Sequence, residues 1–485
     1  MPENSAPREL ESGTEAFVSW GEFLSSSYRA ALALVCLAVW LHAADALIVA
    51  TMLPSIVGDI GGAGLVGWSV SLYEIASVIA GAASALLTMR YGLRLPMSLA
   101  ALVFALGCLV SALAPTMPIL LVGRIFQGAG GGGLVAMSFV AVGVIFPRRY
   151  TARALAAVST FWGVSAFLGP LIGGFFVEVA TWRWGFGFFA VQAFCLAAWI
   201  ALRPDQSAPR GASTHGFPVR RLGLLCLAVL LVSYAGVEIS RVQTTLFVLF
   251  GLGCLGLFLW QDNRAGADRL LPISPFDFRY PTGSALTMIF ALSIATITIT
   301  AFGPLLVTAI HGTSALSAGY VVACSSIGWT ITAVLVSGAP EKLDRLLIAL
   351  GMALLALSVV GFLYAVPNGP VWLIAAFAAL EGGGFGMAWT FTLRRTTALA
   401  DPSEVHRISG AMPTVQRLGF ALGAAYVGIV ANASGLTSMN TPSEAAEVAR
   451  WIFLACVPFA VLGLVAMIPL VKPTRPRGTG IPQSD

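Results

Sequence analysis

Fourteen runs of apolar residues dominate the sequence. A helix needs about 18 or more largely apolar residues to cross roughly 30 Å of hydrocarbon. Only 10% of the 485 residues are charged and 58% are hydrophobic, whereas soluble domains carry about a quarter charged residues. The pattern predicts an all-α polytopic membrane protein with fourteen transmembrane helices and excludes a water-soluble fold. The runs begin near residues 29, 67, 95, 118, 154, 183, 222, 243, 282, 314, 346, 370, 408 and 449.

The distribution of basic residues predicts the orientation in the membrane. Residues 1–27 contain five glutamates and one arginine, so they lack the basic start of a secretory signal and are predicted to form a cytoplasmic tail. Of the 27 Lys and Arg residues, 22 fall in the two tails and the even-numbered loops. By the positive-inside rule, both termini are expected in the cytoplasm. The net charge of +5 then reflects topology and not a nucleic-acid surface.

The sequence offers little for enzymatic or metal chemistry. All seven cysteines lie inside predicted spans and form no CxxC pair, so we expect neither disulfides nor a metal site. There is no HExxH motif, no paired aspartates and no GxxxxGK[ST] loop, and Lys342 and Lys472 are the only lysines. A membrane enzyme is therefore disfavoured, and no catalytic residue is predicted.

An internal repeat divides the chain. The stretch Gln127–Gly132 aligns with Glu381–Gly386, and each is followed by a pair of arginines. In the next span of each half, one arginine and two glycines recur at the same offsets. These are Arg153, Gly169 and Gly174 in the first half and Arg407, Gly423 and Gly428 in the second. Parallel repeats are common in transporters. We therefore expect six-helix bundles at 28–203 and 271–471, a linker with an inserted helix pair at 204–270, and a cytoplasmic tail at 472–485.

Several motifs resemble those of a known family. The fourth span reads RIFQGAGGGG from Arg124 to Gly133, and the fifth reads GVSAFLGPLIGG from Gly163 to Gly174. They resemble the fourth-helix arginine motif and the fifth-helix antiporter motif of the major facilitator superfamily. The first span contains DALIVATMLP from Asp45 to Pro54, which resembles a motif of the fourteen-helix drug:proton antiporter branch. The sequence is identified as a member of that branch.

The resemblance implies a function. It implies the major facilitator fold and a secondary active transporter that works by alternating access, most simply exporting amphipathic or drug-like molecules in exchange for protons. The proton gradient would supply the energy without a cofactor, and the protein would act as a monomer among the lipids of a bacterial inner membrane. Two alternatives stay open, a proton-coupled importer of a nutrient, siderophore or peptide-like solute and a carrier of lipids or glycolipids.

The resemblance also implies residues that serve conformational change. Gly169-Pro170 interrupts helical hydrogen bonding and is expected to bend the fifth span. In the loop after the second span, Ala85 and Met89 replace the glycine and acid that are usual in the superfamily. The residues assigned to conformational change are Gly163, Gly169, Pro170 and Gly174 in the fifth span and Arg90, Gly92 and Arg94 in the loop.

Ionisable side chains inside spans are costly and mark transport pathways. At 1.5 Å per residue, Asp45 lies roughly 12 Å below the outer end of its helix, Glu74 roughly 10 Å and Arg124 roughly 9 Å. Two carboxylates beside one arginine would form a proton switch, because protonation of one changes the pairing of the other. Glu74 serves equally well as a salt-bridge partner of Arg124. His42 lies three residues before Asp45, where it either relays the proton or forms a hydrogen bond within the bundle.

The second half contains a candidate for cargo recognition. Glu381 lies roughly 16 Å into its helix, near the bilayer midplane where carriers of this kind bind their cargo. By the repeat, Gln127 is its counterpart. Glu381 would recognise a cationic substrate or bind a second proton, unless Arg417 neutralises it. Tyr73, Trp389 and Arg417 complete the predicted substrate-binding set with Glu381 and Gln127.

Overall fold

The computed structural model describes the chain except residues 1–19, 26, 203–217, 402 and 473–485. Most of the described residues are helical, and none of them lies in a strand. The short helix α1 (Trp20–Ser25) lies beside the start of α2. The long helices are α2 (Arg29–Ile60), α3 (Val66–Tyr91), α4 (Arg94–Ala112), α5 (Met117–Ile145), α6 (Arg148–Val179), α7 (Trp182–Ala201), α8 (Val219–Tyr234), α9 (Arg241–Arg264), α10 (Pro281–His311), α11 (Ala315–Val336), α12 (Asp344–Asn368), α13 (Val371–Leu399), α14 (Val405–Ala433) and α15 (Pro442–Val471).

These fourteen long helices confirm the predicted fold class. Thirteen of them are at least 18 residues long and apolar enough to cross a bilayer. The exception is α8, which has 16 residues and is about 24 Å long. It begins after Pro218, and the backbone turns at Gly236 before α9 begins at Arg241.

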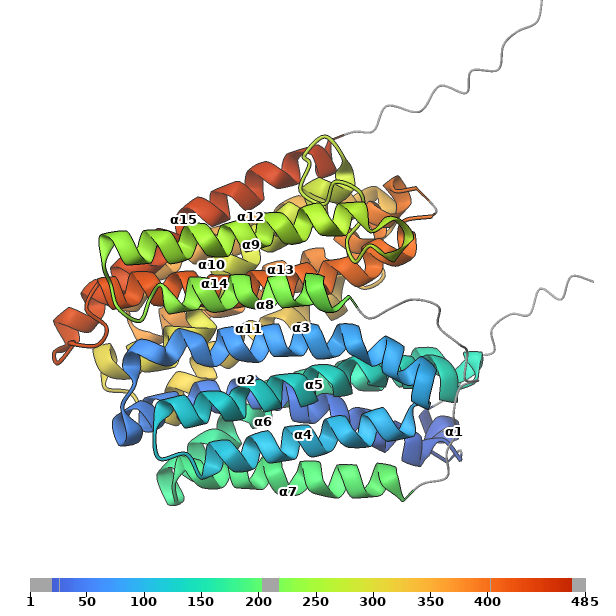
Figure 1. Cartoon of the computed structure of the whole chain (residues 1–485), viewed down its shortest axis with the longest axis horizontal. Helices are drawn as coiled ribbons and strands as arrows, with labels where there is room; N and C mark the ends of the chain where they lie inside the picture. The colour runs from blue at the N-terminus through green and yellow to red at the C-terminus, as the bar shows by residue number, and fades with distance from the viewer. Residues whose placement is uncertain (1–19, 26, 203–217, 402, 473–485) are drawn as a thin grey trace, which may run out of the picture.

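Two groups of helices pack around separate apolar cores. The first bundle comprises α2 to α7, and the second comprises α10 to α15 (Figure 1). The most buried helix of each is its first, with 78% of the apolar window of α2 and 89% of that of α10 buried. Both contact helices of the opposite bundle, so they stand at the centre of the molecule. Polar side chains on α2 are thereby kept away from lipid.

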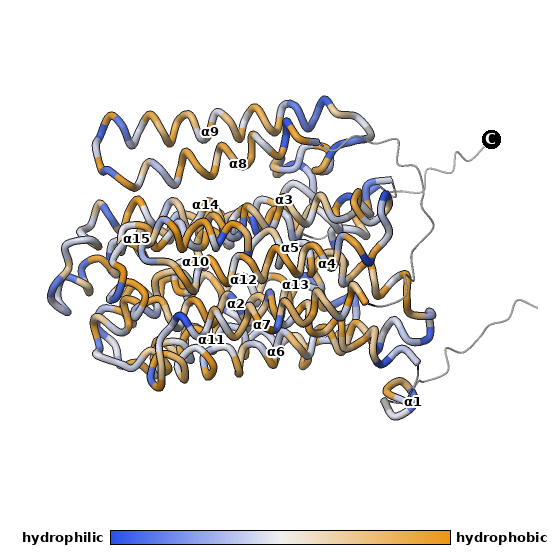
Figure 2. Tube along the Cα trace, turned by 60° about the horizontal axis from the view of Figure 1, so that its bottom comes forward, coloured by the Kyte–Doolittle hydropathy of each residue, from blue (hydrophilic) through white to orange (hydrophobic). Residues whose placement is uncertain are grey.

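The inserted pair α8 and α9 lies on one side of the bundles, as Figure 2 shows. The helix α8 packs against both α3 and α14, while α9 packs mainly on α8. Only 11% of the apolar window of α9 is buried. An apolar helix this exposed is suited to contact with lipid.

The two bundles make close contacts at one end. We call the face at which α2 begins and α15 ends the terminal side and the opposite face the distal side. Near the distal side, the Ser71 hydroxyl donates to the carbonyl of Ala421 (2.9 Å). The Asn432 amide donates to Gly64 (2.8 Å) and to Gly236 (2.7 Å). These bonds connect α14 to the start of α3 and to the α8–α9 turn.

Glycines set the helix spacing inside the first bundle, which gives a testable prediction. A Cβ on Gly128 would collide with the backbone of Tyr73, whereas one on Gly143, farther along the same helix, would meet open space. We expect Gly128→Ala to lower the free energy of unfolding by about 1–3 kcal/mol, because close-packed backbones must separate. The matched variant Gly143→Ala should be neutral or slightly stabilising. Thermal unfolding in detergent measures both, and equal melting temperatures would contradict this account.

Candidate functional site

A buried ion pair occupies the centre of the first bundle. The Arg124 guanidinium, from α5, donates to Asp45 Oδ2 on α2 at 2.6 Å, and the two side chains are 3% and 2% exposed. Removing two charges from water is costly, and breaking a pair of this kind leaves an uncompensated charge. The 2.6 Å ion pair shows that Asp45 and Arg124 lie together, as their similar depth in the bundle predicts.

Arg124 also organises its surroundings. It donates to Gln127 Oε1 at 2.8 Å and to the carbonyl of Ser69 at 3.4 Å. Its guanidinium lies 4.3 Å from the centre of the Tyr73 ring, a cation–π contact. The Gln127 amide in turn donates to Cys108 Sγ at 3.3 Å. Arg124 is thus held by α2, α3 and its own helix, and both polar atoms of the Gln127 side chain have a protein partner.

A second set of hydrogen bonds crosses from one bundle to the other. Arg417, on α14, donates to Glu74 Oε2 (3.1 Å), to Ser77 Oγ (3.1 Å) and to His42 Nε2 (2.9 Å). The other ring nitrogen of His42 lies 2.7 Å from the Tyr73 hydroxyl. Because Nε2 accepts from the arginine, this arrangement matches a neutral imidazole that carries its proton on Nδ1. One polar network therefore links Asp45, through side chains of the first bundle, to Arg417 of the second bundle.

This network corrects two expectations. The partner of Glu74 is Arg417 and not Arg124. Of the two adjacent residues Tyr73 and Glu74, it is Tyr73 that contacts Arg124. The described ion pair of Arg417 is with Glu74, so the structure does not support the alternative in which Arg417 neutralises Glu381. His42 lies between Tyr73 and Arg417 and has no described hydrogen bond to the Asp45 side chain.

Glu381 lies inside the second bundle. Its side chain is 3% exposed, and its Oε1 atom has no hydrogen-bond partner, although Ser325 of α11 lies beside the carboxyl group. Unlike Gln127, its counterpart in the repeat, Glu381 is incompletely satisfied. Trp389 packs against Trp329, with ring centres 6.0 Å apart. Among the described residues, no group of three or more His, Cys, Asp or Glu side chains could hold a metal ion.

The glycine motif of α6 faces two kinds of neighbour. A Cβ on Gly169 would meet Leu47 of α2, within the same bundle. Cβ atoms on Gly163 and Gly174 would approach Thr330 at 3.4 Å and Leu316 at 2.7 Å, both on α11 of the second bundle. The helix is continuous from Arg148 to Val179 through Pro170. Gly174 therefore permits the close approach of α6 to α11 of the second bundle, and Gly169 permits the close approach of α6 to α2.

The loop between α3 and α4 lies at the terminal side. Gly92 has a φ of 76°, a left-handed conformation that favours glycine and ends α3. Arg90 is exposed and lies over the ring of Tyr91, 5.3 Å from its centre. Arg94 begins α4. These three residues lie apart from the buried network.

Several members of the network were not predicted from the sequence. Ser69, Ser77 and Cys108 all contact Arg124, Arg417 or Gln127. One signal was available, since Ser69, Tyr73 and Ser77 recur every four residues and share one face of α3. Asn432 carried no comparable signal, because its partners belong to distant segments.

Comparison with known proteins agrees with this fold. The model of the Major Facilitator Superfamily matches residues 35–262 and 285–484. The chain belongs to the Major Facilitator Superfamily. It is therefore a multi-pass membrane transporter, and the predicted family is confirmed. Membership in this family indicates a transporter and not an enzyme.

Individual relatives are similar over most of their length. A probable multidrug-efflux transporter of Mycobacterium tuberculosis is 30% identical, with 92% of this chain and 95% of that protein covered. The multidrug efflux pump SdrM of Staphylococcus aureus is 25% identical over 85% of this chain and 92% of its own. The crystal structure of a D-xylose-proton symporter superposes with a TM-score of 0.62 at 16% identity, covering 92% of this chain and 97% of that one. This last likeness concerns the fold alone.

Proposed function

We propose that this protein is an alternating-access exporter that moves amphipathic or drug-like molecules out of the cell in exchange for protons. The observation that carries the proposal is the polar network from Asp45 to Arg417, which places ionisable groups of both bundles in hydrogen-bond contact. The names of the relatives from M. tuberculosis and S. aureus support efflux as the direction and drug-like compounds as the cargo.

The proton would act on Asp45. Protonation removes the charge that Arg124 pairs with, so the guanidinium must strengthen its contacts to Gln127 and to the Tyr73 ring or move. Tyr73 is hydrogen-bonded to His42, which accepts from Arg417 of the other bundle. A change at Asp45 can therefore bias a contact between the bundles. Proton coupling requires a local change of charge, here at Asp45, that alters the arrangement of the two bundles.

The contact between the bundles supports alternation. The described hydrogen bonds between the bundles run from α14 to Gly64, Ser71, Glu74 and Ser77 and to His42. They hold the distal side closed. Loss of the Arg417 contacts would free α14 to separate from α3, and rocking of one bundle against the other opens such a carrier.

Glu381 is proposed to contact the cargo or to bind a second proton. The unpartnered Oε1 atom supports either role, because a buried acceptor without a donor gains from a ligand that donates to it. Trp389 of α13 packs against Trp329 of α11, and the two rings would add an aromatic surface. The substrate-binding roles predicted for Gln127, Tyr73 and Arg417 are less direct, because those side chains already bind one another or their neighbours.

Substitution of Glu381 distinguishes its two roles. If the carboxylate recognises cations, Glu381→Gln should weaken transport of a cationic dye about tenfold or more, because a hydrogen-bonded charge contact contributes about 1.5–3 kcal/mol. Transport of a neutral compound should change little. The measurement is initial transport rate in proteoliposomes for both compounds. An equal loss for both would assign Glu381 a proton-binding or structural role.

The setting proposed for this exporter is the plasma membrane of a bacterium, with both termini in the cytoplasm, as the basic residues of the terminal side indicate. The protein would work as a monomer with the proton gradient as its energy source and without a cofactor. The alternative functions, solute import and lipid or glycolipid transport, share this fold. They differ from export in the direction of coupling or in the cargo.

A further inference from the structure

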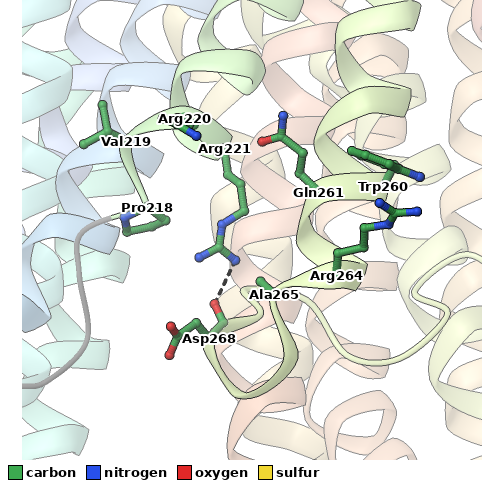
Figure 3. Close-up of a pocket in the computed structure, with 9 residues that line it drawn as sticks. All are labelled: Pro218, Val219, Arg220, Arg221, Trp260, Gln261, Arg264, Ala265 and Asp268. Carbon is green, nitrogen blue, oxygen red and sulfur yellow. Dashed lines mark hydrogen bonds between the residues drawn. The ribbon is translucent and has the colours of Figure 1, made fainter.

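A cavity of about 520 Å³ opens at the terminal side, outside both bundles. It lies between the beginning of α8 and the end of α9, and three arginines line it (Figure 3). Arg220 and Arg221 belong to the first turn of α8, and Arg264 is the last residue of α9. Because both helices end here, the cavity lies at the level of the membrane surface. The polar network of the first bundle does not include it.

Two of the three arginines are available to a ligand. Arg221 donates to Asp262 Oδ1 at 2.6 Å and to the carbonyl of Asp268 at 2.7 Å, so its charge is matched within the protein. Within the part of the chain that the structure describes, Arg220 and Arg264 have no ion pair. Arg264 lies over the Trp260 ring, 4.0 Å from its centre. The Asp268 carboxylate also lines the cavity, but Figure 3 shows it pointing away from Arg221 and Arg264.

The start of α8 adds backbone donors to these side chains. The residue before the helix is Pro218, which makes no side-chain cap, and the first helical hydrogen bond runs from Leu222 to the Pro218 carbonyl. The N–H groups of Val219, Arg220 and Arg221 therefore have no partner within the helix. Such groups, at the positive end of the helix dipole, favour a phosphate. The arginines of the cavity and the start of α8 thus both favour an anion.

The surface above the cavity is suited to acyl chains. Trp260 is 51% exposed, and Leu257, one turn closer to the middle of α9, is 44% exposed. Beyond them, Gly253 and Gly256 face open space, so this part of the helix surface is a shallow apolar strip. A tryptophan at the boundary between apolar and polar surroundings is the usual residue of the membrane interface. Hydrocarbon attached to a phosphate in the cavity could therefore lie on this apolar strip. A free phosphate would gain nothing from the strip, so the surface favours a lipid.

We propose that this cavity binds the headgroup of an anionic phospholipid. The headgroup phosphate contacts Arg220, Arg264 and the first N–H groups of α8, and an acyl chain lies along Leu257 and the glycines of α9. Basic pockets between transmembrane helices at the membrane surface bind anionic headgroups in this way. The inserted hairpin would thereby be anchored by a lipid at its terminal end.

Lipid binding by the purified full-length protein tests the proposal. In detergent, phosphatidylglycerol should raise the melting temperature more than phosphatidylcholine, because only the first carries a net negative charge. The variant Arg220→Gln/Arg264→Gln should lose this difference. Since each arginine near a membrane surface contributes about 1 kcal/mol, we expect the affinity of the double variant for phosphatidylglycerol to fall about 30-fold. Native mass spectrometry of the lipid-bound protein gives the affinities.

A matched control separates the cavity from general surface charge. Arg345 is an exposed arginine at the terminal side, on α12, outside the cavity, and Arg345→Gln should keep the phosphatidylglycerol effect. The proposal is overturned if the double variant binds phosphatidylglycerol as tightly as Arg345→Gln does. It is also overturned if inorganic phosphate raises the melting temperature as much as phosphatidylglycerol, because the site would then be one for free phosphate. None of these measurements requires transport, so they are independent of the proposed export function.

Discussion

Replacing Asp45 by asparagine should abolish proton-driven transport while the protein still folds. Asparagine retains the shape of the side chain and can accept a hydrogen bond from Arg124, but it cannot bind and release a proton. Gradient-driven transport in proteoliposomes should fall to the level of protein-free liposomes. Because Arg124 loses its counter-charge, we also expect a cost of up to about 3–5 kcal/mol in stability.

Two controls accompany this variant. Asp59 lies on the same helix, near the distal side, in an exposed pair with Arg183, and Asp59→Asn should transport normally because exposed pairs contribute little. Circular dichroism and gel filtration of Asp45→Asn should match the wild type. If Asp45→Asn transports at the wild-type rate along a pH gradient, Asp45 has only a structural role.

Replacing Arg417 by glutamine should loosen the contact between the bundles at the distal side. The variant removes the cation that binds Glu74 and His42 across the interface. Hydrogen bonds to charged groups contribute about 1.5–3 kcal/mol, so the population of the distal-open state should rise by a factor of about ten or more. Hydrogen–deuterium exchange measures this rise, and faster exchange is expected in residues 61–72 and 424–440.

A charge-matched variant and a double variant make this test specific. Arg450→Gln removes an exposed arginine near the distal end of α15 and should leave exchange unchanged. Glu74→Gln should loosen the same segments as Arg417→Gln, and the double variant should add little, because both changes break one contact. Additive effects, or exchange in Arg417→Gln equal to that in Arg450→Gln, would show that this ion pair does not hold the bundles together.

The fold was predictable because its determinants are local. A run of apolar residues must form a helix in lipid, where each backbone polar group needs an internal partner, so the fourteen spans followed from the sequence alone. Even for α8, the shortest of the long helices with 16 residues, the predicted start near residue 222 lies close to the observed start at Val219. The recurrence of glycines and an arginine at the same spacing in both halves similarly indicated the internal repeat.

The buried site was less predictable because its contacts are long-range. Helix depth placed Asp45 and Arg124 at one level, and the structure joins them. Depth gives no rotation about the helix axis, so it could not decide whether Glu74 turns toward Arg124 or toward the second bundle. The true partner of Glu74, Arg417, lies 343 positions away, where no local pattern reports a contact.

The coupling of cargo to protons is the central claim, and transport into liposomes with an acidic interior tests it most directly. Protein molecules whose terminal side faces the outer solution should carry a permanently charged cationic dye into the liposomes. The dye should then accumulate inside against its own concentration gradient. A protonophore, or the variant Asp45→Asn, should abolish this accumulation. Dye accumulation that is the same with and without the pH gradient would contradict proton coupling, and dye movement in the same direction as the protons would contradict export.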